Sequence, residues 1–161
     1  MTGGKAVSDP TQQGLPGEST LLTPRGKRVE GMPGMQLRAC IAKIHRATVT
    51  EADLNYVGSI TIDADLLDLS GMRPYQYVNI TSLANGTFWQ TYVVAGKRGS
   101  GQVCLNGPPA HHFRPGDKII VLAEALVRPA EFEHLDPIIV IVESDDNLKT
   151  RVIRHGDVAH G

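Results

Sequence analysis

The chain has 161 residues, a length that suits one domain with a buried core. Its 16 basic and 17 acidic side chains leave a net charge of −1. It has no concentrated basic patch, no apolar signal segment and no apolar run long enough to cross a bilayer. We therefore expect no nucleic-acid or membrane partner, and predict a cytoplasmic protein whose ligand is a small polar molecule.

Composition divides the chain into three parts. Residues 1–34 are rich in Gly, Pro, Ser and Thr without an apolar period, which predicts a disordered N-terminal extension. Residues 35–145 hold the apolar segments and are predicted to form the folded domain, followed by a polar, frayed C-terminal tail at residues 146–161. Cys40 and Cys104 lack the spacing of metal ligands, so we interpret both as reduced thiols of the core.

Residues 36–49 are predicted to form a strand, because apolar side chains alternate with polar or small ones. Lys43 and His45 are two positions apart in this segment, so both side chains should lie on one face of the strand. From the residues alone, that face is either solvated or the wall of a pocket.

The dipeptide Gly58-Ser59 is a candidate for chemistry on the backbone itself. If the Ser59 hydroxyl attacks the Gly58 carbonyl, the amide becomes an ester. Elimination and hydrolysis then leave a pyruvoyl group on residue 59 and divide the chain in two. Gly58 suits this step because it has no Cβ to obstruct the hydroxyl. A Gly-Ser pair without further context is usually a turn, and we interpret Gly99-Ser100 in that way.

The other predicted elements are short. They are a helical turn at 50–53 with capping-box spacing, a strand at 60–62, a helix at 63–71, a hairpin at 78–94 with a type I′ turn at Asn85-Gly86, a strand at 102–105, a turn and helix from 106, and buried strands at 118–123 and 138–142. Adjacent His111 and His112 diverge on a helix, so no metal site is expected. Many short strands and few helices predict a mainly β fold with short helices, of the barrel type.

Several motifs occur together and in order. They are residues 43–50, 52–59 and 62–66, Asn85-Gly86, Thr91-Tyr92, residues 98–101, Asn106-Gly107 and Ala110-His111. In this combination the chain resembles the aspartate 1-decarboxylase family, pyruvoyl enzymes that make β-alanine for pantothenate, over residues 35–145. The resemblance implies a double-psi β barrel, a homotetramer with active sites between subunits, self-cleavage between residues 58 and 59, and a possible maturation factor.

The resemblance also implies a role for individual residues. Ser59 would become the pyruvoyl group that forms a Schiff base with the amino-acid substrate, Tyr92 would donate the proton after CO2 leaves, and Thr91 would assist maturation. Lys43 would hold a substrate carboxylate and His45 would border the site. The residues that would shape the pocket are Tyr56, Gly58, Asn106, Gly107, Pro108 and Pro109.

Two features depart from the family pattern. Phe88 stands where the family has a carboxylate-binding arginine, and Pro108 and Pro109 remove two backbone donors from the pocket loop. One alternative is therefore a related decarboxylase for another amino acid, and a second is an uncleaved, non-catalytic barrel. Strand alternation puts Thr91 and Tyr92 on opposite faces, so a shared site needs a bulge, a long reach or another subunit.

Overall fold

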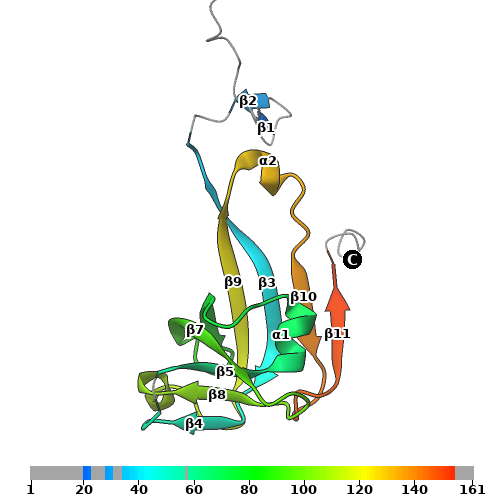
Figure 1. The fold of residues 1–161 in the computed structure, drawn as a ribbon. Coiled ribbons are helices and arrows are strands. Elements are labelled where there is room, and N and C mark those ends of the chain that lie inside the picture. Colours follow the sequence, from blue (N-terminus) through cyan, green and yellow to red (C-terminus); the bar gives the residue numbers. More distant parts are fainter. Residues whose placement is uncertain (1–19, 23–27, 31–33, 57, 155–161) are drawn as a thin grey trace, which may run out of the picture.

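The computed structural model describes residues 20–22, 28–30, 34–56 and 58–154. Most of the N-terminal extension that we predicted to be disordered lies outside the described residues. Within it, β1 (Thr20–Leu22) and β2 (Arg28–Glu30) pair as a small antiparallel sheet. From residue 34 onward the described chain is built around one nine-stranded sheet with short helices (Figure 1).

The large sheet has the strand order β11-β10-β3-β9-β6-β7-β5-β8-β4. Its strands and the helices are β3 (Leu37–Thr48), β4 (Glu51–Asp53), β5 (Ser59–Asp63), α1 (Ala64–Ser70), β6 (Tyr77–Ser82), β7 (Phe88–Gly96), β8 (Val103–Asn106), the 3-10 helix η1 (Pro108–His111), β9 (Lys118–Val127), α2 (Pro129–Phe132), β10 (Ile138–Val142) and β11 (Thr150–Ile153). None of the helices in the described ranges is long and apolar enough to cross a membrane.

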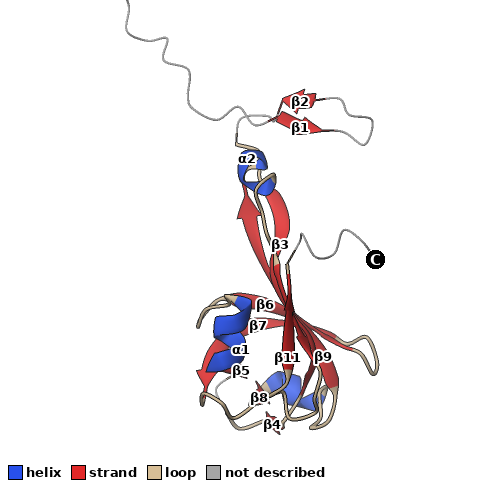
Figure 2. Cartoon of the chain, turned by 90° about the vertical axis from the view of Figure 1, so that its right-hand side faces the viewer, coloured by secondary structure: helices blue, strands red, loops and turns tan. Residues whose placement is uncertain are grey.

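The sheet curves back on itself because β4 follows β3 after only two residues. β3 and β4 lie far apart in the strand order, yet Val49 and Thr50 join them covalently. Thr50 also ties this corner to β8, since its N–H donates to the Val103 carbonyl at 2.8 Å and its Oγ1 accepts from the Val103 N–H at 3.0 Å. The seven strands β3-β9-β6-β7-β5-β8-β4 therefore enclose a barrel, seen in the lower half of Figure 2.

The interior of the barrel collects alternate side chains from the strands that surround it. Ile44 of β3, Ile60 of β5, Ile80 of β6 and Val93 of β7 are all fully buried, and Phe113 after η1 joins them. The neighbouring positions in each strand face outward, as the two-residue period of a strand requires. The predicted mainly β barrel is thus confirmed, and its double-psi crossing stays a prediction.

Helix α1 begins and ends where the sequence indicates. Asp63 caps its first turn by accepting the Asp65 N–H at 2.8 Å, and Gly71 ends it in a left-handed conformation at φ 72°. The buried Asp63 carboxylate also accepts the N–H groups of Gly99 and Gly101, at 3.0 and 2.6 Å. One side chain therefore caps the helix and holds the loop between β7 and β8.

Two local predictions were wrong. Residues 51–53 form β4 instead of a helical turn, because pairing in parallel with β8 satisfies their backbone groups. The β6–β7 hairpin is present, but its turn is not type I′, which needs two positive φ angles. Only Gly86 has one, at 72°, while the Asn85 side chain accepts the Thr87 N–H at 2.9 Å.

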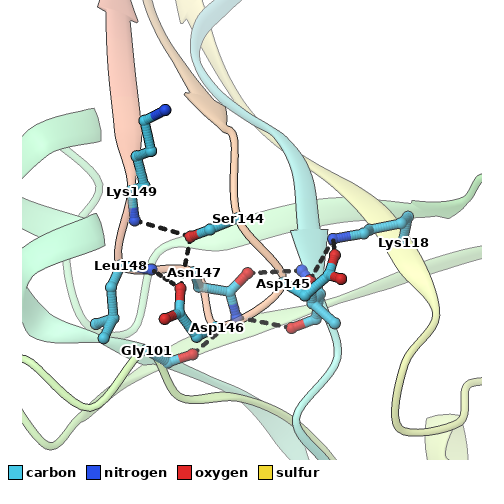
Figure 3. A network of polar contacts seen from close by, with 9 residues as sticks. Gly101, Lys118, Ser144, Asp145, Asp146, Asn147, Leu148 and Lys149 are labelled. Carbon is cyan, nitrogen blue, oxygen red and sulfur yellow. Dashed lines mark hydrogen bonds and ion pairs between the residues drawn. The ribbon is translucent and has the colours of Figure 1, made fainter.

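Residues 146–154, which we predicted to belong to a polar and frayed tail, are held against the barrel, and residues 155–161 lie outside the described residues. The described segment contains β11, which pairs with β10, and Asn147 is only 2% exposed. The Asn147 amide donates to the carbonyls of Thr48 and Gly101 at 2.9 and 2.8 Å and accepts the Thr48 N–H at 2.7 Å (Figure 3). A few buried polar contacts therefore hold this segment to the barrel, which apolar patterning does not reveal.

Candidate active site

Ser59 is the first residue of β5 and is only 1% exposed. It pairs across the sheet with Asn106, the last residue of β8. The Asn106 Nδ2 group donates to Ser59 Oγ at 3.2 Å and to Thr61 Oγ1 at 2.9 Å. The Cys104 thiol donates to Asn106 Oδ1 at 3.0 Å. A buried serine hydroxyl thus receives a hydrogen bond from an amide that also bonds the side chains of Cys104 and Thr61.

Gly107 packs directly against the backbone that precedes Ser59. Its φ angle is 74°, and a Cβ at this position would lie 2.9 Å from the Gly58 Cα and 3.3 Å from the Tyr56 carbonyl oxygen. The Gly107 N–H donates to the Asp53 carbonyl at 2.7 Å, which keeps the two segments together. The close approach therefore depends on glycine at residue 107.

Helix η1 borders the same place through its two prolines. Pro108 and Pro109 begin η1, and the Pro108 ring would be 3.7 Å from a Cβ added at Gly58. Proline suits the first helical positions because the missing N–H has no partner there. The structure therefore brings Gly58, Ser59, Asn106, Gly107 and the η1 prolines together, with the Tyr56 backbone beside them.

Tyr92 lies beside Ser59 on the neighbouring strand. β5 and β7 run parallel with Ile60 paired to Val93, so Ser59 and Tyr92 each come one position before this pair. Ile60 and Val93 face the core, and the alternation of side chains therefore turns Ser59 and Tyr92 to the same outer face. The Tyr92 ring stacks on Tyr75, with their centroids 6.2 Å apart.

Thr91 lies on the opposite face of β7 from Tyr92. It pairs with Val78, and the β6–β7 ladder runs without a register shift from Tyr77↔Tyr92 to Thr81↔Phe88. Regular alternation therefore applies, and no bulge turns Thr91 toward Tyr92.

Lys43 and His45 lie on the outer face of the same sheet, several strands away. The ladder pairs Lys43 with Leu122 of β9, Leu122 with Asn79 of β6, and Asn79 with Gln90 of β7. The next strand after β7 is β5, so Lys43 is four strand spacings from the strand of Ser59, about 19 Å along the curved sheet. A single chain does not bring Lys43 or His45 to Ser59.

His45 sits in a setting that favours its neutral form. Its Nδ1 atom is buried and has no hydrogen-bond partner among the described residues. Burial, together with the positive charges of Lys43 and Arg46, lowers the pKa of His45 below its ordinary value. In its neutral form His45 adds no positive charge beside Lys43 and Arg46.

Phe88 is at the far end of the same outer face. It pairs with Thr81, whose row continues through Ile120 to His45. The ring is 60% exposed and provides no hydrogen-bond donor, as the sequence indicates. The face therefore combines cations, among them Lys43 and Arg38 of β3, with large exposed rings.

Reasoning from the sequence missed Cys104 and Thr61. Each lies two positions from a residue that was singled out, Cys104 from Asn106 and Thr61 from Ser59, so alternation puts them on the same faces. That signal becomes useful only when the pairing of β5 with β8 is known. Among the described residues there is no group of three or more His, Cys, Asp or Glu side chains placed to hold a metal ion.

Comparison with known proteins gives consistent matches. A family model described as aspartate decarboxylase matches residues 35–149. The aspartate 1-decarboxylase of Lactiplantibacillus plantarum is 48% identical over 119 residues, which cover 73% of this chain and 92% of that protein. The protein of the same name from Aliarcobacter butzleri is 47% identical over 115 residues, covering 71% and 91%. That from Clostridium acetobutylicum is 43% identical over 126 residues, covering 77% and 99%.

Proposed function

Because this chain belongs to the aspartate decarboxylase family, we propose that it converts L-aspartate to β-alanine and CO2 with a pyruvoyl group made from Ser59. The product would serve pantothenate and coenzyme A biosynthesis in the cytoplasm. The observation that carries the proposal is the buried Ser59 hydroxyl, which accepts a hydrogen bond from Asn106 beside the Gly58 backbone. The relatives are named for aspartate, and they give no support to another amino acid or to a non-catalytic barrel.

The residues around Ser59 fit the formation of a pyruvoyl group. The reaction needs a serine hydroxyl close to the preceding carbonyl and a backbone free of side chains there. Gly58 and Gly107 supply that freedom, since a Cβ at residue 107 would lie 2.9 Å from the Gly58 Cα and overlap it. The Asn106 N–H on Ser59 Oγ favours the oxygen as it gives up its proton.

In the proposed maturation, the Gly58-Ser59 peptide bond is first exchanged for an ester and the ester is then eliminated. Ser59 Oγ forms a bond to the Gly58 carbonyl carbon, the Gly58-Ser59 C–N bond breaks, and the hydroxyl proton ends on the Ser59 amine. Loss of the Ser59 Cα proton then breaks the Cβ–Oγ bond and leaves Gly58 with a free carboxylate. The resulting dehydroalanine isomerises to an imine, which water hydrolyses with loss of ammonia, leaving the keto group on residue 59.

Once formed, a pyruvoyl ketone supplies an electron sink for the bond that breaks when CO2 leaves. The chain's own residues would bind and protonate the substrate. The Tyr92 hydroxyl, on the strand next to residue 59 and on the same face, is the proposed proton donor. Lys43 is the proposed partner of a substrate carboxylate, with neutral His45 beside it. Thr91, on the other face of β7, is the proposed aid to maturation on the strength of the family resemblance.

The proposed site needs two copies of the chain. Lys43 and His45 lie four strand spacings from the strand of Ser59, so they would reach the Ser59 of a neighbouring subunit. The outer face that carries them also exposes Tyr75, Tyr77 and Phe88, which are large rings suited to burial against another copy. We therefore propose active sites between subunits, in the homotetramer that the family resemblance implies.

Denaturing mass spectrometry tests the proposal. The purified chain should convert to fragments of residues 1–58 and 59–161, and only the larger fragment should react with hydrazine. Ser59→Ala should remain one chain, and release of β-alanine from aspartate should follow the fraction cleaved. A wild-type chain that stays intact and makes no β-alanine, alone or with a cell extract, would contradict the proposal. Cleavage only with extract would instead point to a maturation factor.

A further inference from the structure

Asn106 has a side-chain amide that can be placed in two ways, and only one of them donates to Ser59. Turning the amide by 180° would exchange Nδ2 and Oδ1 and put an oxygen against Ser59 Oγ. The hydroxyls of Ser59 and Thr61 can each donate or accept, so neither decides the orientation. The third neighbour, Cys104, is different in this respect.

Cys104 favours the orientation in which Asn106 donates to Ser59. A thiol sulfur is a weak acceptor, whereas an amide oxygen is a strong one, so Sγ–H with Oδ1 is a better pair than Nδ2–H with Sγ. The Sγ–Oδ1 distance is 3.0 Å, and the thiol is 4% exposed, which keeps water from replacing it. Burial, with the nearby negative charges of Glu51 and Asp53, raises the pKa of Cys104, so the thiol retains its proton.

Thr61 holds the other end of the same amide. Nδ2 carries two hydrogens, and its two acceptors are Thr61 Oγ1 at 2.9 Å and Ser59 Oγ at 3.2 Å. The shorter bond to Thr61 fixes the plane of the amide, which leaves the second hydrogen directed at Ser59. The Asn106 amide is thus bonded through its oxygen to Cys104 and through its nitrogen to Thr61, in addition to its bond to Ser59.

We propose that Cys104 and Thr61 are positioning residues for self-cleavage, which hold the Asn106 amide so that its N–H group faces the Ser59 hydroxyl. The proposal rests on the proposed maturation of Ser59 and adds to it two residues that do not touch the reacting bond. It requires hydrogen-bonding groups of the right kind at both positions, and not only side chains of the right size.

The test compares cleavage rates of full-length variants in matched pairs. Cys104→Ala and Thr61→Val remove the hydrogen bonds, while Cys104→Ser and Thr61→Ser keep a hydroxyl in place. Cys40→Ala is the control, because the Cys40 thiol donates to the Ala42 carbonyl of its own strand and, among the described residues, has no bond to the Asn106 amide. Mass spectrometry follows the intact chain over time, and circular dichroism checks that each variant is folded with an unchanged melting temperature.

We expect Cys104→Ala and Thr61→Val to cleave about tenfold more slowly than the wild type, the effect of losing about one hydrogen bond in the transition state. Cys104→Ser, Thr61→Ser and Cys40→Ala should cleave at close to the wild-type rate. Asn106→Asp keeps the shape of the side chain but its carboxylate cannot donate a hydrogen bond, so this variant should cleave more slowly than the other five.

Three other results would contradict the positioning role or the proposed function. Equal rates for the Ala or Val variants and their Ser partners, whether fast or slow, would overturn the positioning role. If Cys104→Ala fails to fold, the Thr61 pair and Cys104→Ser decide in the same way. A wild-type chain that never cleaves would overturn the proposed function itself, which separates that failure from failure of this inference.

Discussion

Gly107 and Gly86 have similar backbone angles in very different surroundings. Their φ values are 74° and 72°, a region that residues with a Cβ rarely adopt. A Cβ on Gly86 would meet nothing within 4 Å, whereas one on Gly107 would lie 2.9 Å from the Gly58 Cα. Residue 86 therefore needs glycine only for its positive φ angle. Residue 107 needs glycine for the same reason and also because two backbone segments approach closely at the proposed cleavage point.

This contrast gives a prediction at the scale of one residue. Gly86→Ala should lower the free energy of unfolding by about 1 kcal/mol and leave cleavage unchanged, because only the backbone angle is strained. Gly107→Ala should cost about 3 kcal/mol and slow cleavage strongly, since Gly58 must move. Urea unfolding in a Ser59→Ala background gives the stabilities, and mass spectrometry gives cleavage in the unmodified background. Equal behaviour of the two variants would contradict the role given to Gly107.

At the scale of elements, the segment between β10 and β11 joins the end of β3 to the loop before β8. Asn147 makes three buried hydrogen bonds, two to the Thr48 backbone and one to the Gly101 carbonyl (Figure 3). Gly101 in turn donates to Asp63, the last residue of the strand that begins at Ser59. The C-terminal segment is therefore connected to the strand of the site through Asn147, Gly101 and Asp63.

We predict that Asn147→Ala lowers the free energy of unfolding by about 3 kcal/mol, because buried backbone groups of Thr48 and Gly101 lose their partners. Asn147 has a φ angle of 62°, so Asn147→Gly should be about 1 kcal/mol less harmful than alanine. Both variants should be measured by urea unfolding in the Ser59→Ala background. If Asn147→Ala and Asn147→Gly lower the free energy of unfolding equally, backbone strain at residue 147 does not contribute to the loss.

At the scale of the whole molecule, one outer face of the sheet carries residues of the proposed site that are too far apart to act within one chain. Lys43 and His45 are at one end of the face, and Tyr92 is at the other. Tyr77, between them, is 64% exposed and its ring centroid is 6.3 Å from that of Tyr92. A contact between copies would cover these rings and bring the two ends together.

We therefore predict that Tyr77→Glu dissociates the assembly, because a carboxylate would lose its hydration in the contact. Light scattering after gel filtration should show a smaller mass. β-Alanine production should fall by at least about tenfold as Lys43 loses its partner site, while cleavage at Ser59 should continue, since its contacts lie within one chain. Leu69→Glu is the control, at an exposed position of α1 outside this face. Full activity from a monomeric Tyr77→Glu protein would contradict the proposed site between subunits.

The sequence allowed a good part of the fold and of the site to be predicted. Alternation of apolar residues located β3, continuous apolar runs located β9 and β10, and Asp63 and Gly71 marked the ends of α1. It failed at β4, whose three residues resemble a helix start and become a strand through pairing with β8. It failed again at residues 146–154, where a polar composition concealed a buried Asn147.

The family and the residues proposed to carry the chemistry could be identified from the sequence, because Gly58, Ser59 and their motifs are local along the chain. Which of these residues lie next to one another could be seen only in the folded chain. The fold put Asn106, Cys104 and Thr61 around Ser59, paired β6 with β7 without a bulge at Thr91 or Tyr92, and left Lys43 four strands away. The physical reason is that strand order and register are set by backbone pairing between distant segments and by burial of a common core, and neither is recorded in any one stretch of sequence.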